Sequence, residues 1–422
     1  MSWAEAKHIE DYLGDKIDGF KDILDPNPVY GFIEHMATLS PSQRIEYIGA
    51  NKNYTPFSLN TGTGAMDLGS WANFPLILSN KPCMVKADGT KDYELNPNDY
   101  TKKADGTSSD VANTSYNGGA FAWLQRIYKN EYVIGTDRYV LFCMTKKNES
   151  FKPVGFVDNN NGVLEGVWLP MFYGAKVGTK LTSFASGYPE KNQQTSDQKT
   201  AIDNFSSRAR FFGGPIIETI VDLLMMWAKT SDLQSAYGNG NSNGYDSTDT
   251  TNYGMKANAV VGGGAFYGTA TGKSLNKILH SLVLGTYNQW QRDPYEVVVN
   301  GVVKVSKNYA YDVTGAAYQG TGAFAHNADG GKWNYPHMFV SVPDYGSVPV
   351  APYNGSTATG ACDGVYINAT QESMTGVCLR FGDCTNGSSA GVRARNWNSV
   401  ASSTYWSFGA SLLLLPPVGA AA

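Results

Sequence analysis

The residues best suited to chemistry lie in the C-terminal segment Thr375–Leu415, where Ser, Thr, Asp, Arg, Asn, Tyr and Trp side chains are interspersed with small residues. Gly382, Gly387, Gly391 and Gly409 divide this segment, and glycine permits tight turns and close approach of the backbone. Rigid aromatic rings combined with small hydroxyl and amide groups are typical of recognition surfaces. The pattern therefore predicts a binding surface rather than a catalytic centre.

The common catalytic and metal-binding signatures are incomplete in this sequence. Neither HExxH nor GxSxG occurs, and the histidines are scattered along the chain. Gly268–Ser274 approximates a phosphate-binding loop, but Tyr267 stands where the first glycine is required. Asp158–Gly162 approximates a calcium loop, but its glycine comes one position early and Leu169 replaces the bidentate Glu. We therefore expect no enzyme activity, no metal and no cofactor.

Composition indicates a β-rich, loop-rich protein. The 422 residues include 46 Gly and 26 Tyr, and only 17% are charged, which favours many turns and few long solvated helices. This length favours two or three domains. A net charge of −4, without clustered Lys and Arg, argues against nucleic acid as a partner. The five cysteines show no CxxC spacing, so we expect isolated thiols rather than disulfides or a zinc site.

Neither an export signal nor a membrane span is expected. The first residues, MSWAEAKHIEDYLGDK, carry charges where a signal peptide has an apolar region. The most apolar helical stretch, Ile216–Ala228, contains Glu218 and Asp222 and is too short to cross a bilayer. We therefore expect synthesis in the cytoplasm without membrane insertion, which fits a particle assembled inside a cell.

The elements that must position the C-terminal segment begin with a helical N-terminus, residues 1–55. An apolar stripe with three- and four-residue spacing starts at Ile9. A second helix is expected near residues 40–48, with Ser40 as its N-cap and Pro41 in its first turn. The stripe must be buried, either in an oligomer or larger assembly or against the chain's own sheet.

Two further regions follow. Residues 56–180 are expected to be β-rich, and Arg126–Met144 within them is expected to form a hairpin with a glycine-containing turn. Residues 181–422 are expected to form the ligand-binding domain. Its best helix is expected over Gly214–Ser231, where a wide apolar face suits packing on a sheet, and a weaker helical pattern covers Ser274–Leu284.

The C-terminal segment contains four characteristic pieces: Phe381-Gly382, Asn386-Gly387, Ala390-Gly391 and Trp406–Ser411. In this order they resemble the variable region of the target proteins of diversity-generating retroelements. Upstream pieces that look similar extend the resemblance to about residues 115–415: Ile127–Phe142, Phe184–Gly187 with Ala209–Trp227, and Gly285–Trp290. The resemblance implies an α+β protein with a C-type-lectin-like fold in its C-terminal part, as in the formylglycine-generating enzymes, preceded by a β-rich region and a helical N-terminus.

In that family, template adenines are copied erroneously, so that Asn codons diversify into Ser, Thr, Tyr, Asp and other codons. The resemblance implies ligand contact by the residues between the fixed positions: Asp383, Cys384, Thr385, Ser388, Ser389, Arg393, Arg395, Asn398, Ser399, Val400, Ser403, Tyr405, Ser407 and Phe408. Trp397 and Trp406 fit a scaffold role as well as a contact role. The alternative for the whole set is a polar loop region without a ligand.

The resemblance also implies a function and a place of action. Many family members lie at phage tail tips, so we expect a receptor-binding protein of the virion tail tip or fibre that recognises a bacterial surface receptor, either protein or glycan. Its other partners would be virion tail proteins and further copies of itself, with a homotrimer suggested by the phage relatives.

Two alternatives share the same expected fold. One is a formylglycine-generating-enzyme-like oxidase, which needs two closely spaced thiols to bind copper. Cys384 lies about where the first thiol could be, but no second cysteine follows it. The other is a structural tail protein or adhesin without variability.

Overall fold

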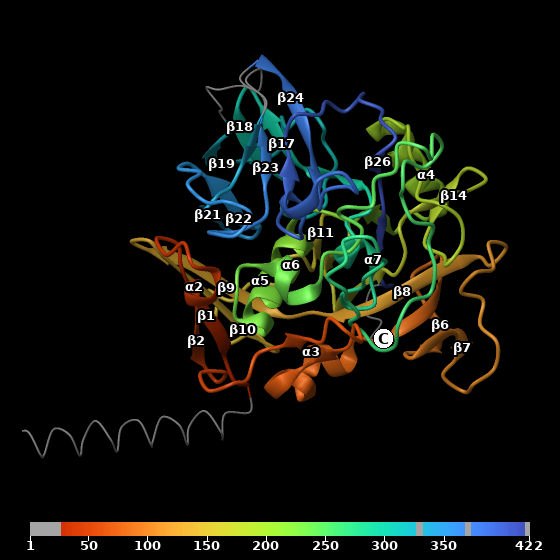
Figure 1. Ribbon diagram of the computed structural model, residues 1–422, viewed down its shortest axis with the longest axis horizontal. Helices are drawn as coiled ribbons and strands as arrows, with labels where there is room; N and C mark the ends of the chain where they lie inside the picture. Colours follow the sequence, from red (N-terminus) through yellow and green to blue (C-terminus); the bar gives the residue numbers. More distant parts are fainter. Residues whose placement is uncertain (1–26, 326–331, 368–372, 418–422) are drawn as a thin grey trace, which may run out of the picture.

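Strands dominate the computed structural model of the chain, which describes residues 27–325, 332–367 and 373–417. Strands account for 34% and helices for 14%, so the expectation of an α+β protein with a C-type-lectin-like C-terminal part is wrong. The strands are distributed over several sheets (Figure 1). The physical reason is that aromatic and β-branched residues form strands wherever a neighbouring strand can pair with them, whatever their local spacing.

The first described elements are strands, where a helical N-terminus was expected. β1 (Tyr30–His35) pairs antiparallel with β2 (Ile45–Gly49), and only α2 (Pro41–Arg44) between them is helical. The helix expected near residues 40–48 is therefore wrong beyond its first turn, because Ile45–Gly49 pairs along the edge of β1. The apolar stripe that starts at Ile9 lies outside the described residues.

Within the described ranges, three larger sheets form the framework of the molecule. The four-stranded sheet has the order β2–β1–β10–β9, and it confirms the expected hairpin of β9 (Tyr128–Ile134) and β10 (Asp137–Cys143). The seven-stranded sheet contains, in order, β16 (Ala209–Phe211), β27 (Leu412–Leu414), β13 (Gly166–Pro170), β8 (Gly118–Gln125), β5 (Pro82–Lys86), β6 (Lys91–Asn96) and β7 (Asp99–Lys103). It therefore combines strands from both sides of the expected boundary at residue 180.

The eight-stranded sheet contains three of the strands of the C-terminal segment. It contains, in order, β19 (Gln319–Phe324), β18 (Val302–Val305), β17 (Trp290–Val299), β24 (Thr375–Arg380), β25 (Arg395–Asn396), β23 (Val365–Ile367) and β20 (Lys332–Asn334), with β26 (Phe408–Gly409) parallel to β17. In Figure 1 this sheet lies at the top, above the four-stranded sheet at the lower left and strands β6–β8 at the lower right.

Small hairpins and short helices complete the fold. The hairpins are β3 (Ser58–Leu59) with β4 (Met66–Asp67), β11 (Val157–Asp158) with β12 (Gly162–Val163), β14 (Ala175–Val177) with β15 (Lys180–Thr182), and β21 (Met338–Val342) with β22 (Gly346–Val350). The helices are η1 (Gly69–Asn73), α3 (Pro75–Ser79), α4 (Thr195–Phe205), α6 (Leu233–Tyr237), α7 (Leu282–Gly285) and η3 (Gly387–Ser389). The helical pattern at Ser274–Leu284 is wrong except for the start of α7. No helix in the described part of the chain combines the length and apolar character needed to cross a membrane.

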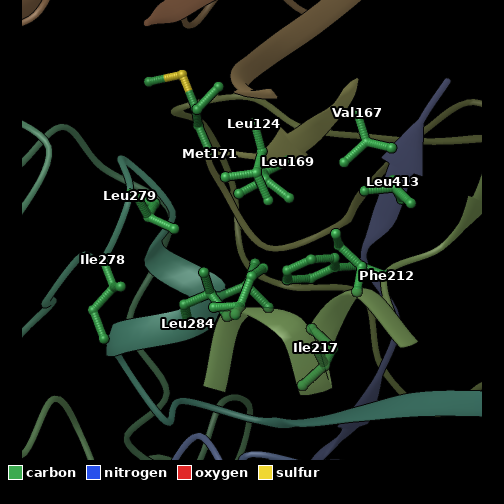
Figure 2. Close-up of a cluster of buried hydrophobic side chains, with 14 of the residues drawn as sticks. Leu124, Val167, Leu169, Met171, Phe212, Ile217, Ile278, Leu279, Leu284 and Leu413 are labelled. Carbon is green, nitrogen blue, oxygen red and sulfur yellow. The ribbon is translucent and has the colours of Figure 1, made fainter. Parts of the chain in front are cut away.

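The helix expected over Gly214–Ser231 is confirmed as α5 (Pro215–Ala228), which is buried along its whole length. Gly214 precedes it with a positive φ of 67°, and Asp293 Oδ1 accepts a hydrogen bond of 2.9 Å from the Gly214 N–H. Figure 2 shows the core that α5 and α7 form with the seven-stranded sheet, with Ile217 and Leu284 on the helices and Leu124, Val167, Leu169 and Leu413 on the strands. Burial of these side chains is the main stabilising contribution.

Two carboxylates interrupt the apolar surface of α5. Glu218 and Asp222 are four residues apart and therefore lie on the same face of the helix. Arg138 of β10 donates to Asp222 Oδ1 over 2.7 Å, and Lys129 of β9 donates to Asp222 Oδ2 over 2.8 Å. These buried ion pairs attach α5 to the four-stranded sheet.

The second carboxylate attaches α5 to the eight-stranded sheet. Glu218 Oε1 accepts from Arg380 of β24 over 2.8 Å and from Arg395 of β25 over 2.6 Å. Arg380 also pairs with Asp293 and Glu296 of β17, at 2.9 Å and 2.7 Å. An unpaired buried charge is strongly destabilising, so these complementary charges favour the observed arrangement of α5 between the two sheets.

Candidate ligand-binding surface

The fourteen expected contact residues divide between open and buried positions. Three are exposed and four are half-buried: Thr385, Ser388 and Tyr405, then Asn398, Val400, Ser403 and Phe408. Seven are buried: Asp383, Cys384, Ser389, Arg393, Arg395, Ser399 and Ser407. For these seven, the expectation that their side chains face outward is wrong.

Arg393 and Arg395 are buried because carboxylates from distant parts of the chain neutralise them. Arg395 pairs with Glu218 at 2.6 Å and with Glu296 at 3.2 Å. Arg393 pairs with Glu34 of β1 at 3.2 Å. The two arginines therefore fasten the C-terminal segment to the core instead of contacting a ligand at the surface.

The electrostatics of Glu296 show how tightly this part is held. Burial alone would raise the pKa of Glu296, but the charges of Arg380 and Arg395 outweigh burial and lower the pKa to about 2. The Trp397 indole N–H also donates to Glu296 Oε1 over 2.6 Å, and Trp397 is fully buried. Of the two roles that the sequence leaves open for Trp397, the structure supports scaffold.

The smaller buried residues are held by hydrogen bonds within their own turns and to other segments. Asp383 Oδ1 accepts from the Thr385 N–H over 2.9 Å and from the Thr385 hydroxyl over 2.6 Å. Ser389 Oγ lies 2.7 Å from the Tyr335 hydroxyl. All three buried serines accept backbone hydrogen bonds through their carbonyls from other segments: Ser389, Ser399 and Ser407. These residues shape the turns from which the exposed side chains project.

Cys384 is a buried neutral thiol. Its Sγ lies 3.6 Å from the carbonyl oxygen of Tyr253, and burial raises its pKa to about 12. The five cysteines are all free and buried, which agrees with the expectation of isolated thiols. A buried, protonated thiol is a poor ligand for copper, so the geometry gives no support to the oxidase alternative.

Five aromatic side chains from two distant segments gather beside the open positions: Tyr245, Tyr253, Tyr405, Trp406 and Phe408. We call this group the aromatic platform. The Trp406 ring centroid lies 4.7 Å from that of Tyr253, 6.0 Å from that of Tyr245 and 5.7 Å from that of Tyr405. Tyr405 and Tyr245 are 53% and 49% exposed, whereas the other three rings are half-buried. The rings therefore support one another and still offer surface to an external molecule.

Backbone hydrogen bonds anchor each of the two segments of the aromatic platform to neighbouring parts of the chain. The Tyr245 N–H donates to the Cys384 carbonyl over 3.1 Å, and the Gly387 N–H donates to the Ser242 carbonyl over 2.9 Å. The Asn192 N–H donates to the Tyr405 carbonyl over 3.1 Å. Main-chain hydrogen bonds therefore hold the backbone of the platform in place.

A buried cation lies close to the platform. Arg292 of β17 is fully buried and lies 5.5 Å from the centroid of the Phe408 ring. Its guanidinium donates to the carbonyls of Gln193 and Ser403, and burial lowers its pKa to about 10, so it stays charged at neutral pH. Burial raises the pKa of the nearby Glu190 to about 7. Arg292 thus ties the loop that carries Tyr405 to the sheet.

Sequence reasoning missed two members of the platform, Tyr245 and Tyr253. They lie within residues 237–254, a polar stretch rich in Gly, Asn, Ser, Thr and Asp. Two tyrosines in such a loop were a usable signal, because aromatic residues in polar loops often serve recognition. Comparison of the chain with protein-family models and with curated proteins gives no match.

Proposed function

We propose that this protein is a receptor-binding protein whose aromatic platform contacts the ligand. The observation that carries the proposal is the convergence of five rings from separate segments on one partly exposed surface. Aromatic side chains that gather at a surface mark an interaction site, because leaving them in contact with water without a partner costs free energy. Thr385, Ser388 and Asn243, which are all exposed, add hydrogen-bonding groups on the connected turns.

The proposed setting is the tail tip or fibre of a virion, with a bacterial surface receptor as the ligand. This part rests on the resemblance of residues 375–415 to retroelement-diversified proteins. In this proposal, diversification acts on the open positions, and the buried ones, Arg393 and Arg395 above all, stay constant. Assembly as a homotrimer would raise weak binding at each site by avidity.

The proposal is tested by measuring binding to a panel of bacterial strains and purified surface glycans with the labelled protein. Y405A and W406A should reduce binding at least about tenfold, as expected for aromatic residues at the centre of a binding surface. The matched control is Y132A, which removes a partly exposed tyrosine that stacks on Tyr139 in the four-stranded sheet.

Unchanged melting temperatures would show that the variants are folded. Equal binding by Y405A, W406A and Y132A would overturn the proposal. A second test compares isolates of the locus: substitutions should concentrate at Thr385, Ser388 and Tyr405, beside a reverse transcriptase and a near-copy of the segment that differs at adenines.

A further inference from the structure

A hollow separate from the aromatic platform opens between several elements of the fold. Its cavity volume is about 470 Å³, which lies within the usual range for small-molecule sites. Its lining comes from β9, residues 146–154, the β11–β12 hairpin, the residues after β18 and the β21–β22 turn. A cavity built from so many elements is a property of the fold rather than of one loop.

The wall of this cavity is apolar. Phe151 and Val154 are buried, Tyr128 and Val157 are half-buried, and Val163 is 55% exposed at the rim. Their side chains together present an apolar surface to the cavity. An apolar body of small-molecule size would gain free energy by displacing water from this wall.

Three lysines surround the apolar wall: Lys146, Lys152 and Lys307. Among the described residues that line the cavity, Asp344 is the one acidic residue, 3.6 Å from Lys307, and it is half exposed. Lys146 pairs with Glu149, which is 86% exposed and outside the lining. Three lysines and Asp344 give the lining a net charge of +2, and Glu149 beside it reduces this to +1, which still favours an anion.

The walls are held in place by main-chain hydrogen bonds. Lys129 and Lys152 exchange backbone N–H···O bonds of 2.8 Å, which fix the lysine-bearing loop on β9. The Asn159 N–H donates to the Asn308 carbonyl over 2.9 Å, which fixes the β11–β12 hairpin on the segment after β18. The site is thus formed without a ligand, so little ordering free energy is lost on binding.

We propose that this cavity binds a small amphipathic anion, with its apolar body against Phe151, Val154 and Val157 and its acidic group among Lys146, Lys152 and Lys307. A neutral apolar molecule would add no counter-charge beside Lys152, which forms no ion pair with any described residue, and a small inorganic anion would leave the apolar wall in water. The proposal does not depend on the function of the aromatic platform.

The experiment uses two probes that differ by one sulfonate group: 8-anilinonaphthalene-1-sulfonate and its uncharged parent, N-phenyl-1-naphthylamine. The sulfonate should bind saturably to the full chain, more tightly than the parent, and more weakly as salt is added. The variant K152Q/K307Q should bind the sulfonate about fivefold more weakly, because each exposed charge contributes modestly. V163D, at the exposed rim, should also weaken it.

Two control variants locate the site. K52Q removes an exposed lysine elsewhere, and W406A alters the aromatic platform; both should bind the sulfonate like the unmodified chain. The proposal is overturned if the sulfonate does not saturate, if both probes bind equally, if K152Q/K307Q binds as tightly as K52Q, or if binding is lost in W406A instead. Failure of the platform proposal would leave all of these results unchanged.

Discussion

Replacing Arg395 with methionine tests how the C-terminal segment is fastened. R395M keeps a long flexible side chain but removes the charge that Glu218 and Glu296 face. Breaking a buried ion pair from one side costs about 3–5 kcal/mol. We therefore expect R395M to lower the free energy of unfolding by about 3–5 kcal/mol.

The assay is urea unfolding at neutral pH, followed by tryptophan fluorescence and extrapolated linearly to water. The matched control is R126M, because Arg126 pairs at 3.0 Å with Glu165, whose side chain is 53% exposed. R126M should lose about 1 kcal/mol or less. Equal losses in R395M and R126M would refute the reasoning, since they would mean that Arg395 is not held by buried charges.

Three further predictions concern the same region. G391A should lower the free energy of unfolding by about 2 kcal/mol, because the added Cβ would lie 2.0 Å from Asp363 Oδ1. The control is G320A, because nothing lies within 4 Å of the Cβ that it adds. Equal thermal unfolding midpoints for G391A and G320A would contradict the prediction. Burial raises the pKa of Asp363 to about 8, so its contribution to stability is present below about pH 4 and is lost as pH rises through about 8. As pH rises over that range, the urea midpoint of D363N should therefore fall less than that of the unmodified chain. An equal fall in the two proteins would contradict this prediction. The lowered pKa of Glu296 contributes stability above about pH 4.5 that is lost as pH falls through about 2. When the free energy of unfolding is measured over this pH range, R395M should lose less stability than the unmodified chain. An equal loss of stability in the two proteins would contradict the prediction.

The sequence predicts those elements that depend on local spacing. The hairpin at Arg126–Met144 and the helix at Gly214–Ser231 follow from runs of side chains that fit one period, and both are present. The expected helix near residues 40–48 failed, because its residues pair with β1 and this pairing decides their conformation. The expected α+β class is wrong for the same reason, because strand pairing decides the conformation of much of the chain.

The burial of the site residues depends on partners that local sequence does not reveal. Arg393 stands in a polar, glycine-punctuated segment that resembles an exposed loop, and its partner Glu34 lies 359 positions earlier. Glu218 was noted as a charge in an apolar helix, but its partners on β24 and β25 come from a later part of the chain. A carboxylate in an otherwise apolar helix is therefore the sequence feature that could have predicted buried arginine partners.

The central claim is that the C-terminal segment combines a buried frame with a set of open positions. The most direct measurement is a saturation library over Gly382–Gly409, displayed on cells and sorted for protease resistance, which reports the folded population. We predict that Thr385, Ser388 and Tyr405 accept nearly every residue, whereas Arg393 and Arg395 accept almost none. Broad tolerance at Arg393 and Arg395, together with strict requirements at Thr385, Ser388 and Tyr405, would contradict the account.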